Sequence, residues 1–180
     1  KDYEIATNQF LIKAASAKNA AKASNELLAF KEDTGSISIT GSNFIVSFNK
    51  TGNGGLSSYK FNGTEQVKQT LLPHFTRPLT DNDKRGWKPQ RKLRQWYEND
   101  MKLVDIKTGK FDGRNGSGIL VECHYSLIHD SAKVIVSYEV SPNGLIRVNY
   151  LLSVTDGLPN IPKVGMQMAT QRNYDNILWY

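Results

Sequence analysis

The sequence predicts an all-β protein, an antiparallel β-sandwich with one short helix. Apolar and polar residues alternate in several segments from Ile37 onward, as in half-buried antiparallel strands. These segments are short and separated by turns rich in Gly and Asn, which is typical of sandwiches. The 180 residues, 39% hydrophobic and 22% charged, suffice for one apolar core.

The N-terminal residues differ from the rest. Residues 13–26 are rich in Ala, Lys, Ser and Asn but have no apolar stripe, so an isolated helix there would be marginal. We interpret them as a linker. Residues 27–30 could add a short strand, and residues 31–36 are expected to form a loop.

The clearest strands follow. Alternation is strongest in residues 37–40, 44–49, 134–140 and 145–150. Turn residues predict connections at 50–55, 112–118 and 141–144. The helix is expected at residues 90–99, where Leu93, Trp96 and Tyr97 share one side.

Composition limits the function classes. The net charge is +6, and the only dense basic patch lies within residues 84–94. A solvated face explains this patch better than a phosphate-binding surface, and no nucleic-acid signature accompanies it, so we expect no nucleic acid partner. No apolar run is long enough for a membrane span. Cys123 is the single cysteine and is expected to be a buried strand thiol.

The most informative stretch is residues 75–87, Phe-Thr-Arg-Pro-Leu-Thr-Asp-Asn-Asp-Lys-Arg-Gly-Trp. Consecutive short polar residues after a proline predict an ordered polar loop. Asp81, Asn82 and Asp83 are expected to cap turn amides and to pair with Arg77 or Arg85. A retaining glycosidase needs two carboxylates about 5 Å apart. In an extended loop Asp81 and Asp83 would point to opposite sides, so a structural role is favoured over catalysis.

Four stretches together resemble family 2 β-galactosidases of the Escherichia type. Residues 75–87 resemble the signature "R-x-P-x-D-N-D" of their small C-terminal domain. Three more agree in order: residues 39–63 with a "G-x-L-x-S-Y" and an "N-G" turn, residues 158–166 with "L-P-x-I-P-R-I-G", and residues 174–180 with the strand before a "G-x-G-P-x-E-x-Y" motif. The resemblance covers about residues 36–180, and residues 3–11 resemble the last strand of the preceding domain.

The resemblance implies a twisted super-sandwich of the galactose mutarotase type, here truncated. Residues 1–30 would be the tail of an immunoglobulin-like domain plus linker, and residues 31–180 the first part of the small-chain sandwich. The chain begins within a strand pattern and ends on Trp179 and Tyr180, so we expect a piece of a longer protein. That end is expected to leave a sheet edge or apolar face uncovered.

The resemblance also implies a function. Such enzymes hydrolyse terminal β-D-galactosyl groups with retention, and both catalytic glutamates lie in an upstream (β/α)₈ barrel. This part would be non-catalytic, pack on the barrel and the immunoglobulin-like domains, and line the cleft for the β-galactoside. No metal site is expected in this chain, although parent enzymes often use Mg and Na bound by other domains.

The cleft-lining residues implied are Arg77, Asp81, Asn82, Asp83, Gly86 and Trp87. The family's mobile loop begins at the glycine and corresponds to residues 86–90, shorter here than in long members. The Trp87 indole could stack on a sugar face or pack beneath the loop, and the sequence favours neither. Trp96 is expected in the core.

Two other functions remain open. A free-standing carbohydrate-binding module would need exposed, coplanar Trp and Tyr side chains on one sheet face. A mutarotase-like isomerase would need His124, Glu122 and another acid in one pocket. No His and Cys cluster has zinc spacing, and the nucleophile-elbow and P-loop motifs are missing.

Overall fold

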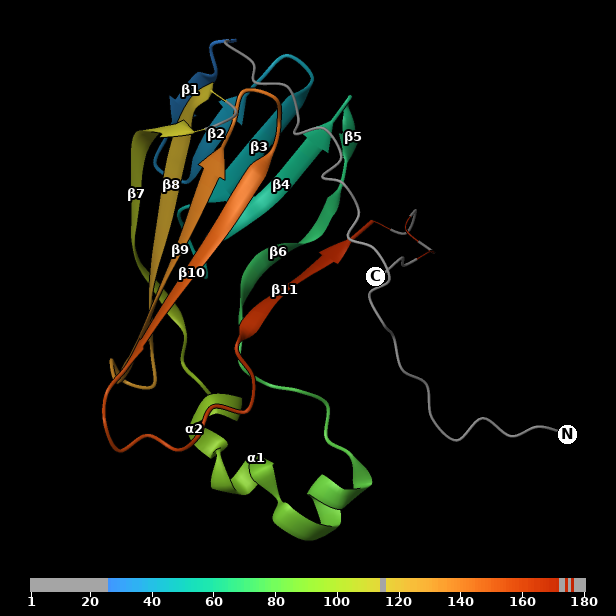
Figure 1. Cartoon of the computed structure of the whole chain (residues 1–180), viewed down its shortest axis with the longest axis vertical. Coiled ribbons are helices and arrows are strands. Elements are labelled where there is room, and N and C mark those ends of the chain that lie inside the picture. The colour runs from blue at the N-terminus through green and yellow to red at the C-terminus, as the bar shows by residue number, and fades with distance from the viewer. Residues whose placement is uncertain (1–25, 114–115, 172–173, 175, 177–180) are drawn as a thin grey trace, which may run out of the picture.

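The protein is a two-layer antiparallel β-sandwich, which confirms the predicted fold class (Figure 1). The structure, a computed structural model, describes residues 26–113, 116–171, 174 and 176. The predicted linker at residues 13–26 therefore lies almost entirely outside the described residues, as do residues 3–11 and most of 174–180.

One layer contains seven strands in the order β1-β2-β3-β4-β6-β11, with β5 paired to β4. Its strands are β1 (Ala29–Glu32), β2 (Ser36–Thr40), β3 (Phe44–Asn49), β4 (Gly55–Phe61), β5 (Thr64–Glu65), β6 (Val67–His74) and β11 (Gly165–Thr170). The other layer has the order β10-β9-β8-β7. Its strands are β7 (Lys102–Gly113), β8 (Gly116–Leu127), β9 (Ala132–Val140) and β10 (Ile146–Val154).

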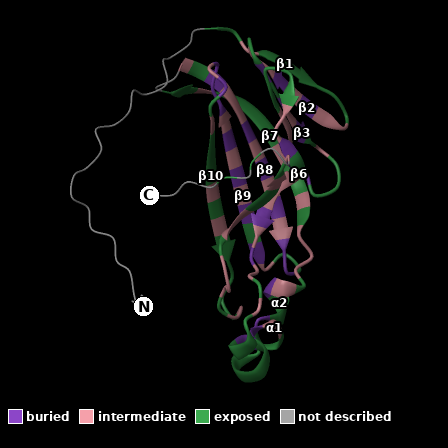
Figure 2. Ribbon diagram, turned by 90° about the vertical axis from the view of Figure 1, so that its right-hand side faces the viewer, coloured by how far each residue is buried: buried purple, intermediate pink, exposed green. Residues whose placement is uncertain are grey.

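The core lies between the layers, where the alternating apolar residues meet (Figure 2). Phe48 of β3 and Tyr138 of β9 are fully buried, and their rings touch edge to face with centroids 5.0 Å apart. The Tyr59 hydroxyl donates a hydrogen bond to the Gly144 carbonyl at 3.0 Å, which joins the two layers. Cys123 is buried as expected, and burial raises the pKa of its thiol to about 11.

The turns agree with the sequence in two places. Asn62 and Gly63 both have positive φ, 49° and 79°, as a two-residue hairpin turn between β4 and β5 requires. Gly144 closes the β9–β10 turn by donating its amide to the Ser141 carbonyl. The expected loop at 31–36 is shorter: β1 extends to Glu32, and only residues 33–35 connect it to β2.

The helical prediction needs correction. The expected helix at residues 90–99 is two short helices, α1 (Pro89–Lys92) and α2 (Arg94–Tyr97), which Leu93 separates because its backbone is not helical (φ −113°, ψ 27°). A π-helical turn, η1 (Asp83–Trp87), precedes them where a loop was predicted. Pro89 explains the earlier start, since proline fits the first turn of a helix.

Candidate functional site: the helical segment at one end of the sandwich

Residues 77–98, which we call the helical segment, lie beyond one end of the two sheets (Figure 1). They connect β6 to β7 and contain η1, α1 and α2. Most of their residues are exposed, in contrast to the strands above them (Figure 2). The predicted cleft-lining residues all belong to this segment, so its geometry decides what they can do.

An ion pair closes the start of the segment. Arg77 donates two hydrogen bonds to the two carboxylate oxygens of Asp83, at 2.6 Å from Nη1 and 2.9 Å from Nη2. The Asp83 side chain is only 9% exposed and that of Arg77 is 40% exposed. A two-point contact between planar groups fixes orientation as well as distance. The predicted pairing of Arg77 with this polar run is therefore correct, and Asp83 is its partner.

Thr80 also holds the Asp83 carboxylate in place. Its amide and hydroxyl both donate hydrogen bonds to Asp83 Oδ2, at 2.9 Å and 3.0 Å. In the opposite direction, the Asp83 amide donates a 3.3 Å hydrogen bond to Thr80 Oγ1. This is the reciprocal arrangement of a capping box, in which two side chains satisfy the free amides at a helix start. It explains why residues 81–87 are helical and not a loop.

The electrostatics of Asp83 make it unsuitable as a proton donor. The hydrogen bonds from Arg77 and then from the Thr80 amide hold the pKa of its carboxyl far below the ordinary value. It therefore stays ionised at neutral pH, and its negative charge is paired with the positive charge of Arg77. Asp81 and Asn82 are exposed, and the Asn82 side chain makes no capping hydrogen bond. Within the described residues only Asp83 has the turn-capping role that was predicted for all three.

A second contact anchors the segment to the sandwich. Trp96 is fully buried, as predicted, and its Nε1 donates a 2.8 Å hydrogen bond to the Pro159 carbonyl. Its ring packs on Phe75, with centroids 5.2 Å apart. Residues 75–87 and 158–166, the two stretches most typical of the resemblance, therefore meet at the base of the segment.

His74 and Lys163 form a polar contact at the same base. Lys163 Nζ lies 2.9 Å from His74 Nδ1, and Thr76 Oγ1 lies 3.3 Å from Nε2 of the same ring. Desolvation and then the Lys163 charge lower the pKa of His74. At neutral pH the ring is thus uncharged and accepts a hydrogen bond from Lys163.

Gly86 and Trp87 form the exposed end of the segment. Trp87 is 47% exposed and does not pack fully beneath its neighbours. Lys92 Nζ lies 5.9 Å from the centre of the indole ring, within the range of a cation–π contact. Lys88 separates η1 from α1 with a left-handed backbone (φ 54°). The segment thus presents an exposed indole with one cation, Lys92, beside it.

Sequence reasoning missed Thr80 and Pro159. The Thr80 role had a local signal, since Thr followed three residues later by Asp is a capping pattern. Pro159 had none, because its contact with Trp96 spans 63 residues and only the folded chain brings them together.

The residues that the mutarotase-like alternative needs do not line one pocket. His124 Nε2 is 4.0 Å from Glu122 Oε2, and Glu122 also accepts from Ser137 at 2.9 Å. The pocket that His124 lines contains Asp105 and Asp130 but not Glu122. Among the exposed aromatic residues that the structure describes, Phe61 and Tyr174 line one pocket together with Tyr59, whereas Trp87 and Phe30 lie elsewhere. No described Trp lines that pocket, so the Trp and Tyr platform that a carbohydrate-binding module would need is not formed there.

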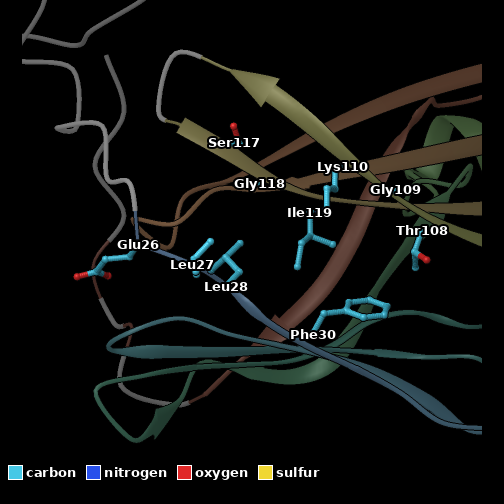
Figure 3. Close-up of a pocket in the computed structure, with 10 residues that line it drawn as sticks. All are labelled: Glu26, Leu27, Leu28, Phe30, Thr108, Gly109, Lys110, Ser117, Gly118 and Ile119. Atoms are coloured by element: carbon cyan, nitrogen blue, oxygen red, sulfur yellow. The ribbon is translucent and has the colours of Figure 1, made fainter.

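Two apolar pockets lie away from the helical segment. One lies between β1 and the β7–β8 hairpin, at the end of the sandwich opposite the segment, and its apolar lining residues include Leu27, Leu28 and Ile119 (Figure 3). The other is lined by residues of β4, β6, β10 and β11, such as Phe61, Val148 and Met168. Neither gathers convergent titratable groups among the residues described, so neither is a candidate active site.

No group of three or more His, Cys, Asp or Glu residues in the described part of the chain could hold a metal ion. The described helices are all too short or too polar to cross a membrane.

Comparisons with known proteins agree with one another. Residues 40–180 match the family model described as the β-galactosidase small chain. The chain is 32% identical to a β-galactosidase of Clostridium acetobutylicum over 183 residues, which cover 100% of this chain and 20% of that protein. It is 26% identical to one of Priestia megaterium over 182 residues, 99% of this chain and 17% of that protein. A Halalkalibacterium halodurans β-galactosidase is 29% identical, with 100% and 18% covered. The chain thus spans about a fifth of the length of these curated relatives.

Proposed function

The chain belongs to the β-galactosidase small-chain family, and from this premise we propose that it is the non-catalytic part of a β-galactosidase. The parent enzyme would hydrolyse terminal β-D-galactosyl groups with retention of configuration. The observation that carries the proposal is the family match over residues 40–180, since it includes the Arg77–Asp83 motif and the residues that anchor it.

The chemistry of the helical segment supports a non-catalytic role. Retaining hydrolysis needs one carboxylate as nucleophile and one protonated carboxyl as acid, about 5 Å apart. Asp83 is held ionised by Arg77, and Asp81 is exposed to solvent. The catalytic carboxylates would therefore come from the barrel of the parent, against which this part would pack together with the immunoglobulin-like domains.

The exposed helical segment would form one wall of the cleft that binds the β-galactoside. It extends beyond the sheets, as Figure 1 shows, and its start is fixed by the Arg77–Asp83 pair. Arg77, Asp81, Asn82 and Asp83 would shape this wall. Gly86 would begin its movable part, and Trp87 would offer its indole face to a sugar ring.

The first test compares the purified chain with the parent enzyme. We expect the parent to hydrolyse a chromogenic β-galactoside and to release β-galactose first, as retention requires, which proton NMR detects. The isolated chain should show no turnover. The control is the chain with Asp81→Ala and Asp83→Ala: turnover by the unsubstituted chain that disappears in this variant would refute the proposal.

A further inference from the structure

The excess positive charge of the chain is concentrated in the helical segment. Residues 84–94 contain six Lys and Arg and no Asp or Glu. The chain has 23 Lys and Arg in all, so 17 remain elsewhere, which equals its 17 Asp and Glu. The rest of the protein is therefore electrically balanced, and the whole net charge of +6 comes from this one stretch.

Five of these six cations lack a carboxylate partner within the described residues. Arg94 pairs with Glu98 at 2.6 Å. The other five are exposed and form no ion pair with a described carboxylate: Lys84, Arg85, Lys88, Arg91 and Lys92. Like charges this close in sequence repel one another, so the cluster lowers stability unless an anion offsets it.

Trp87 lies within this cluster and indicates what kind of anion fits. The indole is 47% exposed, and Lys92 Nζ is 5.9 Å from its centre. A flat apolar surface and a cation therefore lie within the span of a single monosaccharide ring. Indole faces bind the C–H face of sugars, and ammonium and guanidinium groups bind carboxylate and sulfate.

A nucleic acid fits this surface less well. Non-specific binding of a polyanion uses a long positive groove with several aromatic side chains along it. Here the cations occupy one stretch of eleven residues, with one aromatic residue among them, and the remaining charge is balanced. A small anionic ligand matches this extent.

We propose that residues 84–94, the cationic part of the helical segment, select β-galactosides that carry a carboxylate or sulfate group outside the terminal galactosyl ring. This inference rests on the proposed function, because that function brings the segment to the substrate cleft. Trp87 stacks on the sugar unit that bears the anion, and Lys92, the cation beside the indole, attracts the anion. The exposed Lys84 and Arg85, which are close to Trp87 in the sequence, add to the positive charge. Neutral galactosides remain substrates and lack this attraction.

The experiment uses the parent enzyme and matched pairs of substrates. Lactobionate and lactitol contain the same β-galactosyl bond, but lactobionate carries a carboxylate where lactitol carries a hydroxymethyl group. Lactose with a sulfate ester on its glucose unit, compared with lactose, tests sulfate in the same way. We expect a higher kcat/KM for the anionic member of at least one pair at low salt, and a smaller preference in 0.5 M salt, because salt screens exposed charges. The pair that responds identifies the anion.

Substitution then assigns the effect to residues. Lys84→Gln, Arg85→Gln and Lys92→Gln together should reduce the anionic-to-neutral ratio of kcat/KM about tenfold, because exposed charge contacts are individually weak and add up. The matched control removes three equally exposed cations from β4, β6 and β9, as Lys60→Gln, Lys68→Gln and Lys133→Gln. It should leave the ratio unchanged.

Three other outcomes would contradict the inference, the proposed function or both. Equal kcat/KM within both pairs for the unsubstituted enzyme overturns this inference and leaves the proposed function standing. If the triple variant slows both members of a pair equally and melts at lower temperature, the cations dock on an acidic protein surface and the inference is wrong. If the parent hydrolyses none of the four galactosides, the proposed function fails as well.

Discussion

The sandwich and the helical segment are held together in different ways. In the sandwich many buried side chains each contribute to stability. Val46 of β3 and Val136 of β9, for example, are fully buried together with other apolar residues of both layers. The helical segment depends on a few specific contacts, namely the Arg77–Asp83 pair and the buried Trp96. Distributed packing tolerates single changes better than a structure with few anchors does.

This difference relates to function. Binding surfaces are commonly found in regions of low local stability that a rigid scaffold positions. The sandwich is such a scaffold, and the helical segment is the exposed part that we propose faces the substrate. Substitutions that are expected to affect one region and leave the other unchanged test both the structural comparison and the proposed role.

The largest effect is expected for Trp96→Ala. The change removes a fully buried indole and its hydrogen bond to Pro159, which should cost about 3–5 kcal/mol of stability. The loss should fall mainly on the helical segment, because Trp96 connects it to the sheets. Hydrogen exchange measures this as faster exchange of amides in residues 77–98 than in β8 and β9. Trp87→Ala is the control, since an exposed indole contributes little to stability. Equal loss of protection in both regions would show that they form one unit.

Arg77→Ala should loosen the segment without affecting the sandwich. It removes both hydrogen bonds to Asp83 and leaves that carboxylate, 9% exposed, without its cation. Limited proteolysis should then cut within residues 77–98 several-fold faster, and the parent enzyme should lose several-fold in kcat/KM. Arg77→Lys should restore only part of this, because lysine cannot make the two-point contact. Unchanged proteolysis and kinetics would mean that the pair has no role in shaping the cleft.

The same pair predicts a dependence on pH. Because Arg77 holds the pKa of Asp83 below its ordinary value, the folded state favours the ionised carboxylate. The stability that this adds is fully present above the unfolded pKa, about 3.9, and is lost as pH falls from there toward the folded pKa. Asp83→Asn removes this pH-dependent contribution to stability. The stability difference between the unsubstituted chain and this variant should therefore be largest above pH 4 and shrink at lower pH, as urea unfolding at several pH values measures.

The sequence predicted the sandwich better than the helical segment, for a physical reason. The inward side chains of Ile37 and Ile39 follow the two-residue period because a sheet with one buried face imposes it. β7 gives no such signal: it is a mostly exposed edge strand with charged residues along it. β7 is therefore recognised from its pairing with β8 and not from its sequence pattern.

The helical segment was predicted only in part. The Arg77–Asp83 pair and the burial of Trp96 were expected and are present. The helical backbone of residues 81–87 was missed because this polar stretch has no apolar stripe, and its conformation comes from the Thr80–Asp83 capping contacts. The position of the segment depends on Pro159, which no local pattern reveals. That the segment lines a sugar cleft stays a prediction, and kinetics tests it.

Trp87→Ala tests the surface of the segment and not its structure. The indole is 47% exposed, so its removal should leave stability nearly unchanged. In the parent enzyme we expect KM for a β-galactoside to rise about three- to tenfold with little change in kcat, because stacking stabilises ground and transition states alike. Trp87→Phe should retain most of the binding. A KM equal to that of the unsubstituted enzyme would place Trp87 outside the cleft.

The smallest effect is expected at Lys88, between η1 and α1. Its φ of 54° is a left-handed conformation that costs an ordinary residue about 1–2 kcal/mol and costs glycine almost nothing. Glycine also loses more entropy on folding, by roughly 0.5–1 kcal/mol, so Lys88→Gly should raise stability by up to about 1.5 kcal/mol. The matched control is Lys84→Gly, where the backbone lies within η1 and the same substitution should lower stability by about 1 kcal/mol. Urea unfolding of both variants measures the two signs. If both substitutions destabilise equally, residue 88 is not left-handed, and the separation of η1 from α1 at this point is wrong.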